Sequence, residues 1–154
     1  MRSGKMSIID GRKVSKKRLE HLKNKIDKLR DKKQRIPKLS VILIGDDPAS
    51  KTYVRSKELR AEEVGFLHET HHLKKDTSEE AVLNLIDMLN EDKTVDGILL
   101  QLPLPEHLDE EKLLNRIDYR KDVDGLHPMN QGLLGEKAFH FVPCTAKSIM
   151  TLLH

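Results

Sequence analysis

The stretch LSVILIGDDPASKTYVRSK, residues 39–57, decides how the chain folds. Its first seven residues, 39–45, are almost all apolar and rich in β-branched side chains, which is typical of a strand buried on both faces of a parallel sheet. A glycine ends this strand, and one of the two aspartates after it can accept N–H groups from a helix starting at Pro48. We therefore expect a buried strand that leads straight into a helix over 48–64, with Gly65 as its C-cap.

Strand and helix patterns alternate along the rest of the chain, with a broken, polar segment over 119–135 that we interpret as a structured loop. Three strand–helix units in a row predict an α/β fold, a three-layer open parallel (or mostly parallel) sheet with helices on both faces. The other expected elements are a basic helix that ends before Pro37, strands over 66–73, 95–101 and 139–142, and helices over 81–89, 109–117 and 145–154.

Length and composition indicate a single intracellular domain. The chain has 154 residues and one cysteine, Cys144, so it has no internal disulfide and suits a reducing compartment. No apolar run approaches the length of a membrane span, and the first residues lack the apolar block of a signal peptide. We expect a soluble, cytoplasmic protein that does not bind membranes.

The positive charge is concentrated near the start of the chain. Residues 11–35 hold twelve Lys and Arg against three Asp and Glu, which suits nucleic acid or an acidic protein partner. Yet Leu19, Leu22, Ile26 and Leu29 recur at helical spacing, which indicates an ordinary amphipathic helix with a solvated basic face. We favour the second interpretation, because no aromatic side chain interrupts the block to stack on bases.

Lys57, Tyr53 and Gln101 are candidate site residues from position alone. Lys57 and Tyr53 lie one helical turn apart beyond the carboxyl end of a strand, the edge where open α/β sheets bind ligands. A lysine side chain in water has a pKa of about 10.4, so a catalytic lysine needs burial or a cationic neighbour. Gln101 is the polar residue closing an apolar strand. Each residue has a purely structural alternative. Lys57 could be an ordinary surface lysine, Tyr53 a half-buried aromatic residue that faces the sheet, and Gln101 a residue that only ends its strand.

Two carboxylates follow in the polar loop. Asp122 and Asp124 are separated by one residue, so both side chains can project from the same side of an extended segment, as ligand or metal carboxylates do. No further acidic residue stands close enough to complete a metal site. We therefore favour a single carboxylate that binds the donor groups of a heterocycle.

Neither the histidines nor the cysteine predicts a strong site. Adjacent His71 and His72 on a strand point to opposite faces, and with His68 they lack a further well-spaced ligand, so we expect no metal. Cys144 has no specific base in the sequence and fits a buried structural thiol better than a nucleophile.

Four motifs in register resemble those of the bifunctional methylenetetrahydrofolate dehydrogenase/methenyltetrahydrofolate cyclohydrolase family. The match covers the chain from about Asp10 onward, and four motifs in order are far more specific than one. The motifs are GDDPAS (45–50) followed by Tyr53, Val54 and Lys57, GILLQLPLP (97–105), KDVDGLHPMNQG (121–132) and PCT (143–145).

The resemblance implies a folate enzyme of one-carbon metabolism that oxidises methylenetetrahydrofolate with NADP and hydrolyses the methenyl product to formyltetrahydrofolate. It implies that Lys57 is the catalytic lysine, that Gln101 positions it, that Tyr53 stacks on the aminobenzoyl ring of tetrahydrofolate and that Asp124 hydrogen-bonds the pterin. Three further residues would shape the same cleft: Ser50, Leu102 and Pro103.

The resemblance also implies a second, C-terminal Rossmann domain that binds NADP, and a homodimeric full-length enzyme. We expect residues 1–154 to be the catalytic domain alone, without dehydrogenase activity, because the glycines form no G-x-G-x-x-G and the chain stops inside a helical pattern. Cys144 and Thr145 stand near the expected junction, where Ala146 and Ser148 replace the Pro and Gly usual in the family. The alternative is a non-enzymatic α/β binding module whose basic helix engages nucleic acid or an acidic partner.

Overall fold

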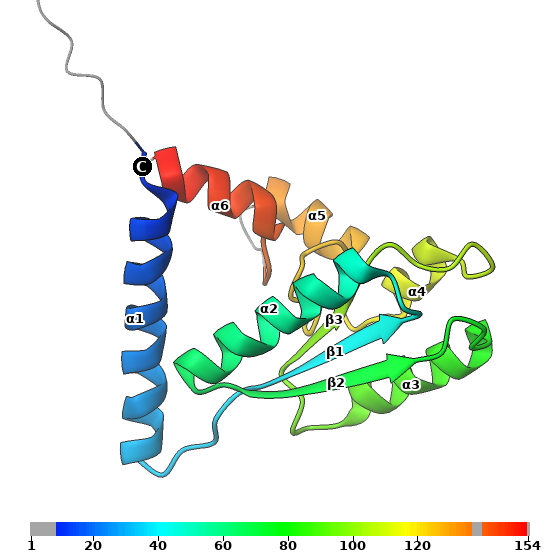
Figure 1. Ribbon diagram of the computed structural model, residues 1–154, viewed down its shortest axis with the longest axis horizontal. Helices are drawn as coiled ribbons and strands as arrows, with labels where there is room; N and C mark the ends of the chain where they lie inside the picture. The colour runs from blue at the N-terminus through cyan, green and yellow to red at the C-terminus, as the bar shows by residue number, and fades with distance from the viewer. Residues whose placement is uncertain (1–8, 137–139, 154) are drawn as a thin grey trace, which may run out of the picture.

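The computed structural model describes residues 9–136 and 140–153, which form a small parallel sheet with helices around it (Figure 1). The order of elements alternates between strands and helices as far as the third strand, and helices follow it. The elements are α1 (Gly11–Asp31), β1 (Lys38–Ile44), α2 (Pro48–Val64), β2 (Leu67–Leu73), α3 (Glu79–Glu91), β3 (Gly97–Leu100), α4 (Glu110–Arg116), α5 (Pro128–Gly135) and α6 (Cys144–Leu153).

The sheet has the order β2-β1-β3, and both pairs are parallel. Leu39 of β1 lies opposite His68 of β2 and Gly97 of β3, so the central strand is paired on both edges. All three carboxyl ends therefore reach the same rim of the sheet. This confirms the predicted α/β class with an open parallel sheet.

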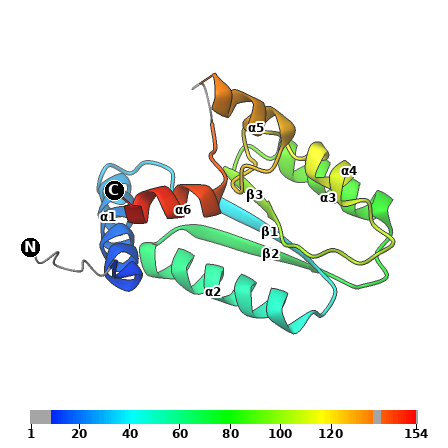
Figure 2. The ribbon, with the colours of Figure 1, turned by 90° about the horizontal axis from the view of Figure 1, so that it is seen from above.

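Side chains of β1 alternate between two apolar layers. Val41 and Leu43 pack with Val54 of α2, whereas Ile42 and Ile44 pack with a larger cluster that includes Ile86 of α3. Figure 2 shows the same division, with α2 on one face of the sheet and α3 and α4 on the other. The continuous apolar run in β1 is thus explained by burial on both faces.

The ends of α2 follow the predicted signals. The Asp47 carboxylate accepts the Ser50 N–H at 2.7 Å, Pro48 occupies the first turn, and Gly65 ends the helix at φ 85°, in the left-handed region that glycine tolerates best. The expected bounds 48–64 are confirmed. Because Pro48 stands four residues after the last residue of β1, the first turns of α2 lie at the carboxyl rim.

The basic segment forms the amphipathic helix α1, as predicted. Ile26 on its apolar side is 3 % exposed, and Arg30 near its end donates to the Gly65 carbonyl at 3.1 Å, which fastens α1 to the end of α2. No helix in the described part of the chain combines the length and the apolar character of a membrane span.

The last third of the chain differs from the prediction. The segment expected to be a loop contains α5, which begins at Pro128 and is capped by the His127 side chain, an N-cap that the composition did not reveal. The strand expected over 139–142 is wrong for residues 140–142, which have no strand partner; residue 139 lies outside the described residues. The helix expected from Thr145 begins one residue earlier, at Cys144.

Candidate active site

Lys57 and Gln101 meet at the carboxyl rim of the sheet. Lys57 is half-buried in the middle of α2, and Gln101 follows directly after β3 and is 8 % exposed. The Lys57 ammonium donates to the Gln101 side-chain oxygen at 3.0 Å, while the Gln101 amide nitrogen donates to the Leu102 carbonyl at 2.6 Å. The backbone thus fixes the orientation of the amide, and the amide fixes the position of the ammonium.

Ser50 and the segment after β3 complete this corner. The buried Ser50 hydroxyl donates to the same Leu102 carbonyl at 3.5 Å, so helix α2 and residue 102 are linked twice. The peptide bond from Leu102 to Pro103 is cis. Pro103 lines a neighbouring pocket of about 770 Å³ together with Gly45, Asp46, Asp47 and Lys75.

Tyr53 lies one turn before Lys57 on α2, and 62 % of its surface is exposed. The alternative of a half-buried tyrosine that faces the sheet is therefore wrong. An exposed aromatic ring beside a polar corner offers a flat apolar surface for stacking, with one hydroxyl that remains hydrated.

Asp124 lies close to the first residue of α6. A Cβ atom at Gly125 would lie 2.8 Å from the Pro143 nitrogen, so only glycine allows this close approach of the two segments. The Cys144 thiol donates to the Val123 carbonyl at 3.4 Å. Cys144 is exposed, so the expectation of a buried structural thiol is wrong. Partial burial of its sulfur, and secondarily the Asp124 carboxylate, raises the pKa of the Cys144 thiol, with a smaller opposing influence from Lys57. Asp124 and Lys57 are thus both within electrostatic range of one sulfur atom.

Asp122 has a structural place that the sequence did not reveal. It is 3 % exposed, and its carboxylate accepts hydrogen bonds from the Gly125 N–H at 3.1 Å, the His127 N–H at 2.8 Å and the Asn130 side chain at 3.0 Å. The possibility of a paired ligand site formed by Asp122 and Asp124 is therefore excluded, and the favoured interpretation, a single ligand carboxylate, stays a prediction for Asp124. An Asp three residues before a Gly at φ 69° is a turn signal that points to this role.

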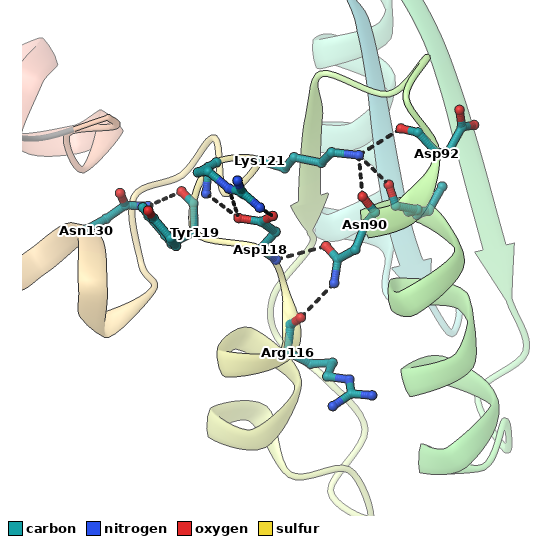
Figure 3. A network of polar contacts seen from close by, with 9 residues as sticks. Asn90, Asp92, Arg116, Asp118, Tyr119, Lys121 and Asn130 are labelled. Atoms are coloured by element: carbon teal, nitrogen blue, oxygen red, sulfur yellow. Dashed lines mark hydrogen bonds and ion pairs between the residues drawn. The ribbon is translucent and has the colours of Figure 1, made fainter.

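Lys121 ties the same segment to the end of α3 (Figure 3). Its ammonium donates to the carbonyl oxygens of Leu89, Asn90 and Asp92 at 2.7–2.8 Å, which the helix end leaves without helical partners. The Asn90 side chain also accepts the Asp118 N–H at 2.8 Å. The Lys121 side chain and the Asp118 N–H therefore both fasten the segment before Asp124 to the end of α3.

The histidines of β2 serve other contacts. The His72 ring lies 2.8 Å from the Gly45 carbonyl, and the His68 ring lies 3.4 Å from Glu62. Within residues 9–136 and 140–153, no group of three metal-ligating side chains comes together. Thr145, placed by the sequence at a domain junction, is exposed in the first turn of α6.

The fold and this corner define an α/β protein with a lysine–amide pair at the carboxyl rim of a parallel sheet, where such folds bind ligands. The family model described as "Tetrahydrofolate dehydrogenase/cyclohydrolase, catalytic domain" matches residues 9–124, a range that contains Ser50, Tyr53, Lys57, Gln101 and Asp124. The chain belongs to this family.

Known proteins agree with this assignment. The "Bifunctional protein FolD" of Streptococcus agalactiae serotype Ia is 46% identical over 145 residues, which are 94% of this chain and 51% of that protein. The crystal structure of the bifunctional enzyme FolD from Campylobacter jejuni is 43% identical with a TM-score of 0.91, and the match covers 96% of this chain and 52% of that one.

A Trypanosoma brucei methylenetetrahydrofolate dehydrogenase-cyclohydrolase, solved with NADP cofactor and inhibitor, is 38% identical with a TM-score of 0.90. The match covers 96% of this chain and 50% of that one. The chain thus spans about half the length of the relatives it matches.

Proposed function

We propose that this chain is the folate-binding catalytic part of an enzyme that oxidises methylenetetrahydrofolate and hydrolyses the methenyl product. The hydrogen bond between Lys57 and Gln101 carries this proposal, because it fixes an ammonium group at the ligand-binding rim. The family match and the bifunctional names of the relatives support the choice of substrate.

In this proposal, Lys57 exchanges protons with the folate. Opening of the methenyl bridge needs water to attack an electron-poor carbon and a proton to reach a ring nitrogen, and a positioned side chain accelerates such steps by about 10²–10⁴-fold. Gln101 holds the Lys57 nitrogen in place. Removal of a hydride from the methylene group depends mainly on orientation, which stacking on Tyr53 and a hydrogen bond from the pterin to Asp124 supply.

The turn that follows the first strand of the sheet does not fit the pyrophosphate of NADP. In dinucleotide-binding domains the pyrophosphate contacts a glycine-rich turn at a helix N-terminus. In this chain the turn between β1 and α2 presents the exposed carboxylates of Asp46 and Asp47, and the latter already caps the helix. We propose that NADP, the cofactor of the Trypanosoma brucei relative, contacts a second domain and that residues 1–154 form one catalytic domain.

We also propose that the full-length enzyme is a homodimer and that it works in the cytoplasm. Light scattering of the full-length gene product and fractionation of its source cells test them. A monomeric enzyme or a membrane-associated fraction would contradict the respective statement.

Calorimetric titration with a stable folate such as 5-formyltetrahydrofolate tests the binding function. We expect saturable binding by the full-length gene product, weakened by roughly 2–10-fold in Tyr53→Ala, because aromatic stacking contributes about 0.5–1.5 kcal/mol. Leu59→Ala, another large exposed residue of α2, is the matched control and should bind like the unaltered protein. No heat of binding at any folate concentration would overturn the proposal.

A further inference from the structure

His127 closes the start of α5 with its imidazole ring. The Met129 backbone N–H donates to the ring nitrogen Nδ1 at 3.0 Å, so the side chain is the N-cap of the helix. A backbone N–H can only donate, and Nδ1 must therefore offer a free lone pair. The ring is thus neutral, with its one proton on Nε2.

Protonation of this ring is incompatible with the cap. An imidazolium carries a proton on both nitrogens and accepts no hydrogen bond. The positive end of the α5 dipole also lies at this ring and disfavours a cation there. Helix α5 has only eight residues, and such short helices depend on their caps and on tertiary contacts. Loss of the cap therefore loosens its first turn.

The first turn of α5 is connected to Asp124 through the Asp122 carboxylate. Asn130 lies completely buried in that turn and donates to one oxygen of this carboxylate at 3.0 Å. The His127 N–H donates to the same oxygen at 2.8 Å. Asn130 also donates to the Tyr119 carbonyl at 2.7 Å, as Figure 3 shows. The other oxygen of the Asp122 carboxylate accepts an N–H in the turn directly after Asp124, so the start of α5 and the position of Asp124 depend on one carboxylate.

The titratable and charged groups near His127 lie mainly around one aromatic ring. The Tyr119 ring faces the imidazole with the two ring centres 6.1 Å apart, and His140 and Arg120 lie against the same Tyr119 ring. The Asp122 carboxylate is engaged by the His127 backbone. In the described part of the chain, the His127 ring contacts a backbone N–H and an aromatic ring and pairs with no carboxylate. An imidazolium would therefore gain no ion pair to compensate for the lost cap.

We propose that neutral His127 is a positioning residue for Asp124 and makes folate binding depend on pH. This inference rests on the function proposed above, in which Asp124 hydrogen-bonds the pterin, and it adds a regulation of that site. With the ring neutral, α5 and the Asp122 carboxylate hold Asp124 in its binding position. With the ring protonated, the turn that carries Asp124 loosens. Folate affinity therefore rises as the imidazole loses its proton, and folate binding reciprocally favours release of that proton.

Two variants separate the cap from its titration. In His127→Asn, the side-chain oxygen replaces Nδ1 as the acceptor, and asparagine is among the best N-cap residues and stays neutral at every pH. In His127→Ala, no side chain caps the helix. We expect His127→Asn to bind folate at pH 8 as tightly as the unaltered protein. His127→Ala should bind it about fivefold more weakly at pH 8, as the loss of one N-cap implies.

Calorimetric titrations of the full-length gene product with 5-formyltetrahydrofolate at pH 8 and pH 5.5 make the comparison. Histidine in model peptides has a pKa of about 6.5, so about one-tenth of such side chains are neutral at pH 5.5. Relative to His127→Asn, the unaltered protein should lose about threefold to tenfold in affinity between pH 8 and pH 5.5, the upper figure applying when only the capped form binds. At about pH 6.5, folate binding should also release more protons from the unaltered protein than from His127→Asn.

The matched control is His21→Asn, which removes an exposed imidazole from α1. This control should keep the pH dependence of the unaltered protein, because only the ring that caps α5 is coupled to Asp124. Melting temperatures at both pH values check that every variant is folded.

The outcomes separate this inference from the proposed function. If His127→Asn and the unaltered protein lose affinity equally between pH 8 and pH 5.5, the inference is overturned and the proposed function stands. If His127→Asn binds folate as weakly as His127→Ala at pH 8, capping is not the role of the ring, and the inference is overturned as well. Absence of folate binding by the unaltered protein at both pH values overturns the inference and the proposed function together.

Discussion

The Lys57 ammonium and the Gln101 side-chain oxygen lie 3.0 Å apart although the two residues are separated by 44 positions in sequence. Parallel pairing explains the encounter. The Gln101 N–H donates to the Ile42 carbonyl at 2.9 Å, so residue 101 lies beside the end of β1, and α2 folds back over that strand from the same rim. The topology of the sheet, not local sequence, therefore assembles the pair.

Gln101→Leu removes the fixed partner of the Lys57 ammonium. We expect turnover of methenyltetrahydrofolate by the full-length gene product to fall about 10- to 150-fold, because a hydrogen bond to a charged group contributes about 1.5–3 kcal/mol. Gln131→Leu, in an exposed position of α5, is the matched control. Equal turnover in the two variants would show that the amide does not matter to the reaction.

Gly97→Ala tests the packing between β3 and the segment that carries Asp124. A Cβ atom at this position would collide with the Val123 side chain. We expect a loss of about 1–3 kcal/mol in the free energy of unfolding, measured by urea denaturation, as is typical of overpacked cores. Gly132→Ala in α5 is the control, since apart from its chain neighbours and its own helix backbone no atom lies within 4 Å of the added carbon, and alanine favours helix. An unchanged free energy of unfolding in Gly97→Ala would contradict close packing between β3 and the Val123 side chain.

Asp122→Asn tests whether the buried carboxylate positions Asp124. The variant replaces one acceptor oxygen of the carboxylate by an NH₂ group, which then faces N–H donors and cannot accept their hydrogen bonds. We expect folate affinity to fall at least fivefold, because an unsatisfied buried polar group costs about 1–3 kcal/mol. A double-mutant cycle with Asp124→Ala separates positioning from general damage. In the Asp124→Ala background, Asp122→Asn should lower folate affinity only slightly further. If it lowers the affinity as much as it does in the unaltered protein, Asp122 has a purely structural role.

Asp96 makes stability depend on pH. Hydrogen bonds from the Arg35 guanidinium, with a smaller one from the Lys38 N–H, hold the pKa of the Asp96 carboxyl below its ordinary value. Its stabilisation is thus complete above the unfolded pKa of about 3.9 and is lost as the pH falls through the lower folded pKa. Asp96→Asn should therefore be less stable than the unaltered protein at pH 6, with a smaller difference at pH 2.5.

Chemical denaturation at both pH values measures this effect. Asp31→Asn, which neutralises an exposed carboxylate at the end of α1, controls for the loss of one negative charge. A stability difference for Asp96→Asn that stays constant from pH 6 to pH 2.5 would rule out a role for the ionised carboxylate.

The sequence predicted elements whose signals are local, and it failed where tertiary contacts decide. The apolar run of β1, the aspartate and Pro48 at the start of α2 and the left-handed Gly65 each act within a few residues, so their positions were predictable. Helix α5 was missed because a histidine caps it and because Asn130 is buried only through distant contacts. Position indicated Lys57, Tyr53 and Gln101 as candidates, but the inward turn of Asp122 depends on three hydrogen bonds that no periodicity reveals.

The Lys57→Met variant isolates the role of the Lys57 ammonium group in hydrolysis. Methionine keeps the length and apolar stem of the side chain and removes its exchangeable protons. We expect hydrolysis of methenyltetrahydrofolate by the full-length gene product to fall at least 100-fold in Lys57→Met. Lys93→Met, which changes an exposed lysine near the opposite end of β3, should retain full activity. Full hydrolytic activity in Lys57→Met would show that the Lys57 ammonium group takes no part in the reaction.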